Sequence, residues 1–301
     1  MFRPFMSSMF LTAETPPRLR LLWRLLGFGV LIFACNFLFL IPVLVLQLLG
    51  WNSEPFIMVQ VASGVATAVA VFIARWLLDR RSIRSLGLAL NRRALIDLGV
   101  GILLAAVMMA LIFTASWAAG WLRVTGFGWE TANPAALLWR SALWGVLFIA
   151  VGFYEELMTR GYILQNLEDG LNTFWAVIIS SAIFGLLHVD NPGAGWVAVV
   201  GITAAGLMFA YGYLRTRSLW LAIGLHIGWN FFEGVVFGFP VSGLETARFL
   251  EIEVAGPAAW TGGAFGPEAG LVMLPALLAG VALIHLYTRG RGATRVAETT
   301  P

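Results

Sequence analysis

Lysine is missing from this sequence, and cysteine nearly so. All nineteen basic residues are arginine, which excludes mechanisms that need a lysine amine, such as Schiff-base or Ser-Lys chemistry. The single cysteine, Cys35, lies in a long apolar segment. One cysteine forms neither a disulfide within the chain nor a multi-cysteine metal site. We therefore interpret Cys35 as a small packing or lipid-facing residue.

Charge is scarce as well. Only 12% of the 301 residues are charged and 59% are hydrophobic, whereas an average soluble domain carries about 25% charged residues. Several apolar runs reach the roughly 20 residues that cross a hydrocarbon core of about 30 Å. The composition therefore predicts one all-α membrane domain over residues 1–301, a polytopic bundle of transmembrane helices whose main solvent is the lipid bilayer.

Eight apolar segments, separated by glycine, proline or charge, are the predicted spans. The first has basic residues before it, is too long for a signal-peptide core and has no small-residue cleavage site close behind it, so we expect it to be retained. Residues 79–95 are too charged to span and predict a helix or loop at the membrane interface. Residues 239–267 predict a long external loop with a partly packed Trp260. The spans are 21–49, 56–78, 97–122, 137–160, 172–189, 196–214, 219–238 and 268–288.

The arginines predict the orientation of the chain. With eight spans both termini fall on one side, and the opposite side has only Arg123, Arg140 and Arg248. The positive-inside rule then places both termini in the cytoplasm, for what we expect to be a bacterial plasma membrane. The basic clusters lie between the apolar segments, as in the loops of a membrane protein. We therefore interpret the net charge of +3 as a signal of membrane topology and expect no nucleic-acid partner. The arginines on the same side of the membrane as the termini are Arg18, Arg20, Arg24, Arg80, Arg81, Arg84, Arg92, Arg93, Arg215, Arg217, Arg289, Arg291 and Arg295.

Ionisable side chains inside spans cost at least about 2.5–3.5 kcal/mol each on insertion scales, so each is a candidate functional residue. The fourth span contains the sequence EELMTR at 155–160. Glu156 and Arg160 are four residues apart with the acid first, which favours an ion pair on a helix. Glu155, rotated about 100° around the helix, then has no local partner. We interpret Glu155 as a general base and the Glu156–Arg160 pair as its structural support.

The fifth and seventh spans supply the other candidates. The fifth ends in FGLLH at 184–188, and the seventh contains HIGWN at 226–230. His226 and Asn230 lie on one helical face, where they could donate to an oxyanion, or the histidine could bind a metal. His188 could join Glu155 in polarising a water molecule. A single histidine or asparagine in a membrane is often only a hydrogen bond between helices, but the combination of six polar residues favours a site.

Two further ionisable residues are weaker candidates. His285 is isolated in the last span, so we interpret it as structural. Glu233 follows His226 by seven residues and is thus near the same helical face. It either joins that face or faces a water-filled vestibule.

The depth of His188 conflicts with the depths of the other candidates. Counted from turns near residues 168 and 216, Glu155 is about 13 residues deep and His226 about 10, but His188 is about 20, or roughly 30 Å at 1.5 Å per residue. Two arrangements would remove the conflict. Either residues 161–175 include an interfacial segment, or the fifth helix is short and ends within the membrane near residues 190–193.

The patterns EExxxR, FxxxH and HxxxN, each in its own hydrophobic span and in that order, resemble the type II CAAX prenyl endopeptidase and bacteriocin-processing (CPBP, or Abi) family of intramembrane proteases. The resemblance covers about residues 150–235, the predicted catalytic core. It implies about eight spans, a conical cavity open toward the cytoplasm, and cleavage near the C-terminus of a membrane-tethered substrate. It also implies that Glu155 and His188 activate water while His226 and Asn230 form an oxyanion hole.

The resemblance leaves the cofactor open, because the family is described both as metalloproteases and as glutamate-dependent hydrolases. If a metal takes part, the expected ion is Zn²⁺ and its expected ligands are Glu155, His188 and His226, which match a catalytic zinc set in kind. No HExxH helix is present to hold such a set locally. A Glu155–His188 dyad needs no metal. Both alternatives stand at this point.

The predicted function is that of an intramembrane endopeptidase acting on a membrane-associated peptide or protein. Two other classes remain. An immunity or scaffold protein would bind a peptide without cutting it, but binding alone does not need both histidines. A transporter or proton relay would use the same buried acids and histidines; it should show paired broken helices, and the sequence has no clear symmetric pair.

Overall fold

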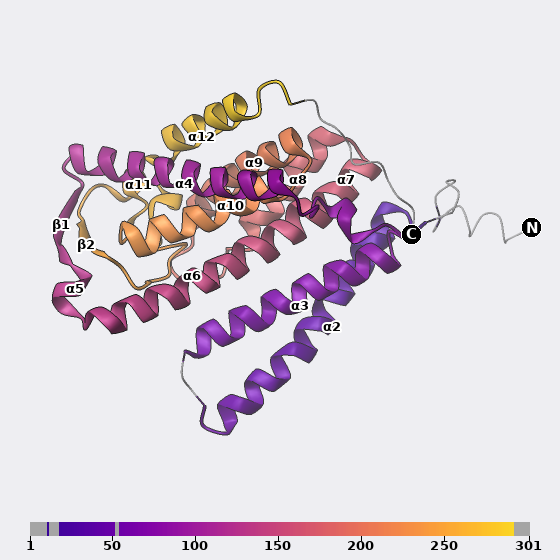
Figure 1. Cartoon of the computed structure of the whole chain (residues 1–301), viewed down its shortest axis with the longest axis horizontal. Coiled ribbons are helices and arrows are strands. Elements are labelled where there is room, and N and C mark those ends of the chain that lie inside the picture. The colour runs from indigo at the N-terminus through magenta and orange to yellow at the C-terminus, as the bar shows by residue number, and fades with distance from the viewer. Residues whose placement is uncertain (1–10, 12–17, 52–53, 292–301) are drawn as a thin grey trace, which may run out of the picture.

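The protein is an elongated bundle of helices (Figure 1) in a computed structural model that describes residues 11, 18–51 and 54–291. Within these residues five helical runs are long and apolar enough to cross a membrane. They are α2 (Leu21–Leu48), α3 (Pro55–Leu77), α4 (Arg92–Ala118), α9 (Trp196–Thr216) and a run over Pro134–Gly170. That run consists of α6 (Pro134–Glu156), the π-helical segment η2 (Leu157–Leu164) and α7 (Gln165–Gly170).

Three shorter apolar helices complete the bundle. These are α8 (Thr173–Leu186), α10 (Trp220–Asn230), which continues into the π-helical segment η3 (Phe231–Val236), and α12 (Met273–Tyr287). Each of the eight predicted spans therefore contains a helix, and the prediction of an all-α membrane bundle is confirmed. The segment predicted at the interface, 79–95, contains one 3₁₀ turn, η1 (Ile83–Leu86), with Leu86 fully buried.

Helix α10 is held very close to α4. A Cβ atom on Gly224 of α10 would lie only 2.2 Å from the carbonyl oxygen of Leu98, and one on Gly101 of α4 only 2.5 Å from that of Leu221. Small residues at these positions let the two backbones approach, as is common in membrane bundles. Because α10 carries two of the candidate site residues, this close contact with α4 fixes their position.

The segment 239–267, predicted as a loop, is largely folded. It contains strand β2 (Leu250–Val254), which pairs antiparallel with β1 (Leu122–Phe127) so that Leu122 lies opposite Val254. Two short helical turns follow, α11 (Ala258–Thr261) and η4 (Gly263–Phe265). Trp260 is 47% exposed and its ring lies 5.5 Å from that of Trp121, which agrees with partial packing. The alternating sequence LEIEV is itself a strand signal, and the prediction of a long external loop left this strand out.

The bundle has two distinct ends (Figure 1). We call the end that carries β1, β2 and the short helix α5 (Gly128–Thr131) the sheet end. At the other end, near α7, the start of α2 and the end of α3 meet, since Arg18 and Arg81 both contact Asp169. The end of α9 joins them through Arg217, the residue after the helix, which pairs with Glu168 at 2.7 Å. We call this the arginine-rich end.

Candidate active site

Both helices that carry the central candidates change their pitch at the site. Glu155 lies in the last turn of α6, directly before the π-helical segment η2. Asn230 is the last residue of α10, directly before the π-helical segment η3. π-helical turns are rare and often occur at functional sites, because the inserted residue redirects the side chains around it.

The carboxylate of Glu155 lies between two imidazoles. Its Oε2 atom is 3.9 Å from Nε2 of His188 and 3.9 Å from Nε2 of His226. This oxygen is buried and has no hydrogen-bond partner, whereas Oε1 accepts a long hydrogen bond of 3.4 Å from the hydroxyl of Tyr154. A separation of 3.9 Å is too long for a direct hydrogen bond. The three groups predicted to work together are thus brought together by the fold.

Each imidazole is oriented by a hydrogen-bond acceptor at Nδ1, the ring nitrogen that does not face Glu155. His188 Nδ1 lies 2.9 Å from the carbonyl oxygen of Phe184, and His226 Nδ1 lies 3.1 Å from Oε1 of Glu156. Because a carbonyl or carboxylate oxygen only accepts, each Nδ1 must carry the hydrogen. In its neutral form each ring then presents the lone pair of Nε2 toward Glu155.

Glu156 is the centre of a buried network. The ion pair expected with Arg160 is present at 2.8 Å, and both side chains are fully buried. Arg160 also donates to Thr159 Oγ1 at 2.8 Å and to the carbonyl oxygen of Gly206 at 2.9 Å. The contact between Glu156 and His226 was missed by sequence reasoning, because the two residues are 70 positions apart and no local spacing reports it.

The position of His188 follows from a short helix. Helix α8 has 14 residues, about 21 Å at 1.5 Å per residue, and ends at Leu186, so that His188 lies in the turn that follows. Of the two arrangements considered for this histidine, the structure has the short helix. A turn beyond the end of a short helix reaches the depth of Glu155, which a full-length span would pass.

All four candidate catalytic residues line one cavity of about 580 Å³. Asn230 is buried one helical turn after His226 and reaches the same space. Most of the wall is apolar or aromatic, as is usual for a site that binds an apolar ligand. The apolar and aromatic wall residues are Phe56, Trp144, Leu147, Phe148, Val151, Tyr154, Met158, Leu187, Pro192, Val241 and Leu244.

The weaker candidates, Glu233 and His285, do not line this cavity. Glu233 is fully buried, which rules out the water-filled vestibule considered for it, and neither of its carboxylate oxygens has a hydrogen-bond partner. Next to it sequence reasoning missed Glu268, which accepts hydrogen bonds from Trp229 Nε1 at 3.2 Å and from Ser242 Oγ at 2.5 Å. The only sign of Glu268 in the sequence was its place as an acid at the start of an apolar segment. His285 bonds to the Tyr211 hydroxyl at 3.0 Å between α12 and α9, as a structural residue would.

Comparison with known proteins points to the same region. Residues 134–232 match a family model described as type II CAAX prenyl endopeptidase Rce1-like. That range runs from the start of α6 into η3 and includes all four candidates. A Bacillus subtilis (strain 168) protein described as "Putative membrane peptidase YdiL" is 34% identical over 122 residues, which are 39% of this chain. The chain spans about half the length (48%) of this curated relative.

Both matches support a CPBP family protein. The region that matches the family model contains the helices that carry the site, and it leaves out α2, α3, α4 and the segment after residue 232. The family model and the relative are both described as peptidases.

Zinc is the cofactor that the sequence left open. The side chains at the site are of the types that bind zinc, but their spacing differs from that of a zinc site. Two ligands on a tetrahedral zinc with bonds of about 2.0–2.2 Å lie about 3.4 Å apart. Both separations between Glu155 Oε2 and an imidazole Nε2 are 3.9 Å. Within residues 11, 18–51 and 54–291, no group of three His, Cys, Asp or Glu residues has metal-binding spacing. The arrangement does not fit a formed zinc site.

The substitution Glu156→Gln tests whether Glu156 orients His226. We expect peptidase activity to fall by about 10²–10⁴-fold, the range seen when a catalytic histidine loses its orienting carboxylate. The measurement is kcat/KM of the purified variant, together with its thermal unfolding midpoint. Glu168→Gln is the matched control, because Glu168 also pairs with an arginine but lies at the arginine-rich end. A folded Glu156→Gln variant as active as wild type would contradict this role.

Proposed function

We propose that this chain is an intramembrane endopeptidase that hydrolyses a peptide bond of a membrane-associated peptide or protein, using water activated by Glu155. One observation carries the proposal. The unpaired Oε2 atom of Glu155 lies 3.9 Å from Nε2 of both His188 and His226, inside a cavity that also contains Asn230. A carboxylate, two imidazoles and an amide are the groups that water attack on a carbonyl needs.

Water attack would use Glu155 and His188. A water molecule between Glu155 Oε2 and His188 Nε2 can donate a hydrogen bond to each, since both atoms offer a lone pair. Glu155 then accepts a proton as the oxygen of water bonds to the carbonyl carbon of the substrate. The same carboxyl can pass that proton to the leaving nitrogen when the carbon–nitrogen bond breaks.

Stabilisation of the oxyanion would use His226 and Asn230. The amide of Asn230 can donate directly to the oxygen that gains charge. His226 can donate from Nε2 only when the ring is doubly protonated, because Nδ1 already donates to Glu156. A buried carboxylate on Nδ1 stabilises that imidazolium form. The contact with Glu156 is therefore what suits His226 to an oxyanion hole.

The cavity wall supports an apolar substrate segment. Phe56 and Gln60 of α3 face the cavity together with Trp144, Leu147 and Phe148 of α6. These side chains would bind apolar residues on either side of the scissile bond, and would limit the access of water to the site. The resemblance to CAAX-processing proteins agrees with a substrate that is itself anchored in the membrane.

Glu155→Gln is the direct test of the proposed function. The amide keeps the size of the side chain and cannot take a proton from water, so we expect cleavage to fall by at least about 10²-fold. Membrane peptides from cells that make each variant would be compared by mass spectrometry, and rates measured on a peptide found in this way.

Glu233→Gln is the matched control, since Glu233 is another buried glutamate near the site but does not line the cavity. We expect it to retain cleavage within about threefold, because it lacks a role in proton transfer to the substrate. A transporter or proton relay would instead depend on Glu233. Equal product from wild type and Glu155→Gln would contradict the peptidase proposal.

Metal removal tests the zinc alternative on the same preparations. The steps above use only side chains and water, so exhaustive chelation should leave the cleavage rate unchanged. The metal content of each chelated sample is measured alongside its activity. A rate that falls with the bound zinc and returns when zinc is added would show that the site assembles around the metal.

A further inference from the structure

The two ends of the bundle carry opposite charge. In the described part of the chain the sheet end has three arginines, Arg123, Arg140 and Arg248, together with a larger number of acids. The arginine-rich end holds most of the remaining arginines. The positive-inside rule places that end in the cytoplasm. The acids of the sheet end are Glu54, Glu130, Asp190, Glu245, Glu251 and Glu253.

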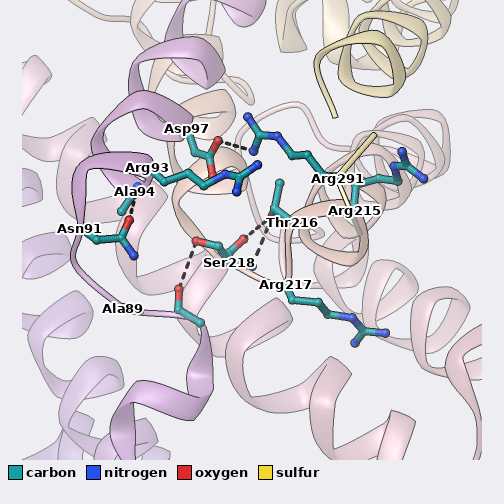
Figure 2. Close-up of a pocket in the computed structure, with 11 residues that line it drawn as sticks. Ala89, Asn91, Arg93, Ala94, Asp97, Arg215, Thr216, Arg217, Ser218 and Arg291 are labelled. Carbon is teal, nitrogen blue, oxygen red and sulfur yellow. Dashed lines mark hydrogen bonds and ion pairs between the residues drawn. The ribbon is translucent and has the colours of Figure 1, made fainter. Parts of the chain in front are cut away.

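A small pocket of about 150 Å³ at the arginine-rich end supports this orientation (Figure 2). Four arginines line it, Arg93, Arg215, Arg217 and Arg291. Figure 2 shows the side chains of Arg93 and Arg291 near Asp97, to which Arg291 is paired at 2.7 Å. Such a basic surface suits the anionic lipids of the cytoplasmic leaflet. No candidate catalytic residue lines this pocket, so it is separate from the cavity of the site.

The cavity of the site lies toward the sheet end. Its lining includes Phe56 at the start of α3, residues 190–192 after the end of α8, and residues 241, 242 and 244 after the end of η3. Helix α3 runs toward the arginine-rich end, so its first turn lies at the other end. Helices α8 and α10 run away from the arginine-rich end, so the segments that follow them lie at the sheet end as well.

On the side toward the arginine-rich end, a packed layer of polar side chains closes the cavity. Directly beyond Glu155, the buried residues of η2 and α7 are bonded to the end of α3. Asp79 accepts from Arg75 at 2.9 Å, from Asn166 at 3.1 Å and from Tyr162 at 3.3 Å. Arg75 also donates to Gln165 at 2.8 Å. All five side chains are buried, and along the α6–η2–α7 run the cavity lining stops at Met158.

From these observations we infer that the catalytic cavity opens on the extracytoplasmic face, and that the scissile bond of the substrate enters from that face. The substrate class is then a membrane-anchored polypeptide with its cleavage site at or beyond the outer leaflet. This substrate class rests on the proposed function. The family resemblance implied a cavity open toward the cytoplasm, while the arginines implied cytoplasmic termini. In this fold those two expectations exclude each other, because the cavity and the arginine-rich end lie at opposite ends.

Single-cysteine labelling tests the inference, and the chain suits it because Cys35 is its only cysteine and is buried. On a Cys35→Ala background, Asp190→Cys places an exposed thiol at the cavity and Arg84→Cys places one at the arginine-rich end. Gln60→Cys places one on the cavity wall. Intact cells with the protein in the plasma membrane are treated with a membrane-impermeant maleimide, before and after permeabilisation.

We expect Asp190→Cys and Gln60→Cys to be labelled in intact cells, and Arg84→Cys only after permeabilisation. Labelling of Arg84→Cys in intact cells, or protection of either cavity thiol until permeabilisation, would overturn the inference. The same cysteines in a Glu155→Gln chain should label identically, because labelling does not need catalysis. A failed cleavage assay would therefore leave the orientation result intact, and a failed labelling result would leave the peptidase proposal intact.

Discussion

The site depends on one buried carboxylate, that of Glu156. It pairs with Arg160 at 2.8 Å and accepts from His226 at 3.1 Å, so one side chain joins η2 to α10. Arg160 extends the connection to α9 through Gly206 and to α8 through the ring of Phe184, 4.3 Å from its guanidinium carbon. Removing one partner of a buried ion pair typically costs about 3–5 kcal/mol. Such a cost keeps four helices in one arrangement, and that arrangement determines where Glu155 lies.

Oε1 of Glu156 is engaged by Arg160 and His226, and this leaves Glu155 free to act. The adjacent carboxylates have opposite surroundings. Oε1 of Glu156 contacts Arg160 at 2.8 Å and His226 at 3.1 Å, and the side chain is fully buried. No cation contacts Glu155 at such a distance within the described residues: its Oε2 faces two imidazole Nε2 atoms at 3.9 Å, without a hydrogen bond. The acceptors behind His188 and His226 complete the division, since they fix the hydrogen on Nδ1 of both rings. Glu156 thus organises the site, and Glu155 is available for chemistry.

Sequence reasoning predicted what local spacing can report. The eight helical segments and the Glu156–Arg160 pair follow from hydropathy and from i,i+4 geometry, and both are present. Contacts between distant segments were missed: the pairing of β1 with β2, the bond between Glu156 and His226, and the bonds of Glu268 to Trp229 and Ser242. The end at which the cavity opens was likewise beyond reach, since it depends on how three separate helices run relative to Glu155. The position of His188 needed the length of α8, which the sequence left as two alternatives.

The central claim is that Glu155 directs water onto a peptide bond. The most direct measurement is to incubate membranes containing the protein in water enriched in the heavy oxygen isotope and to sequence new peptide ends by mass spectrometry. The account predicts new C-terminal carboxylates that contain one heavy oxygen, and their absence when Glu155 is replaced by glutamine. New peptide ends that lack the isotope, or that form equally with the Glu155→Gln protein, would contradict it.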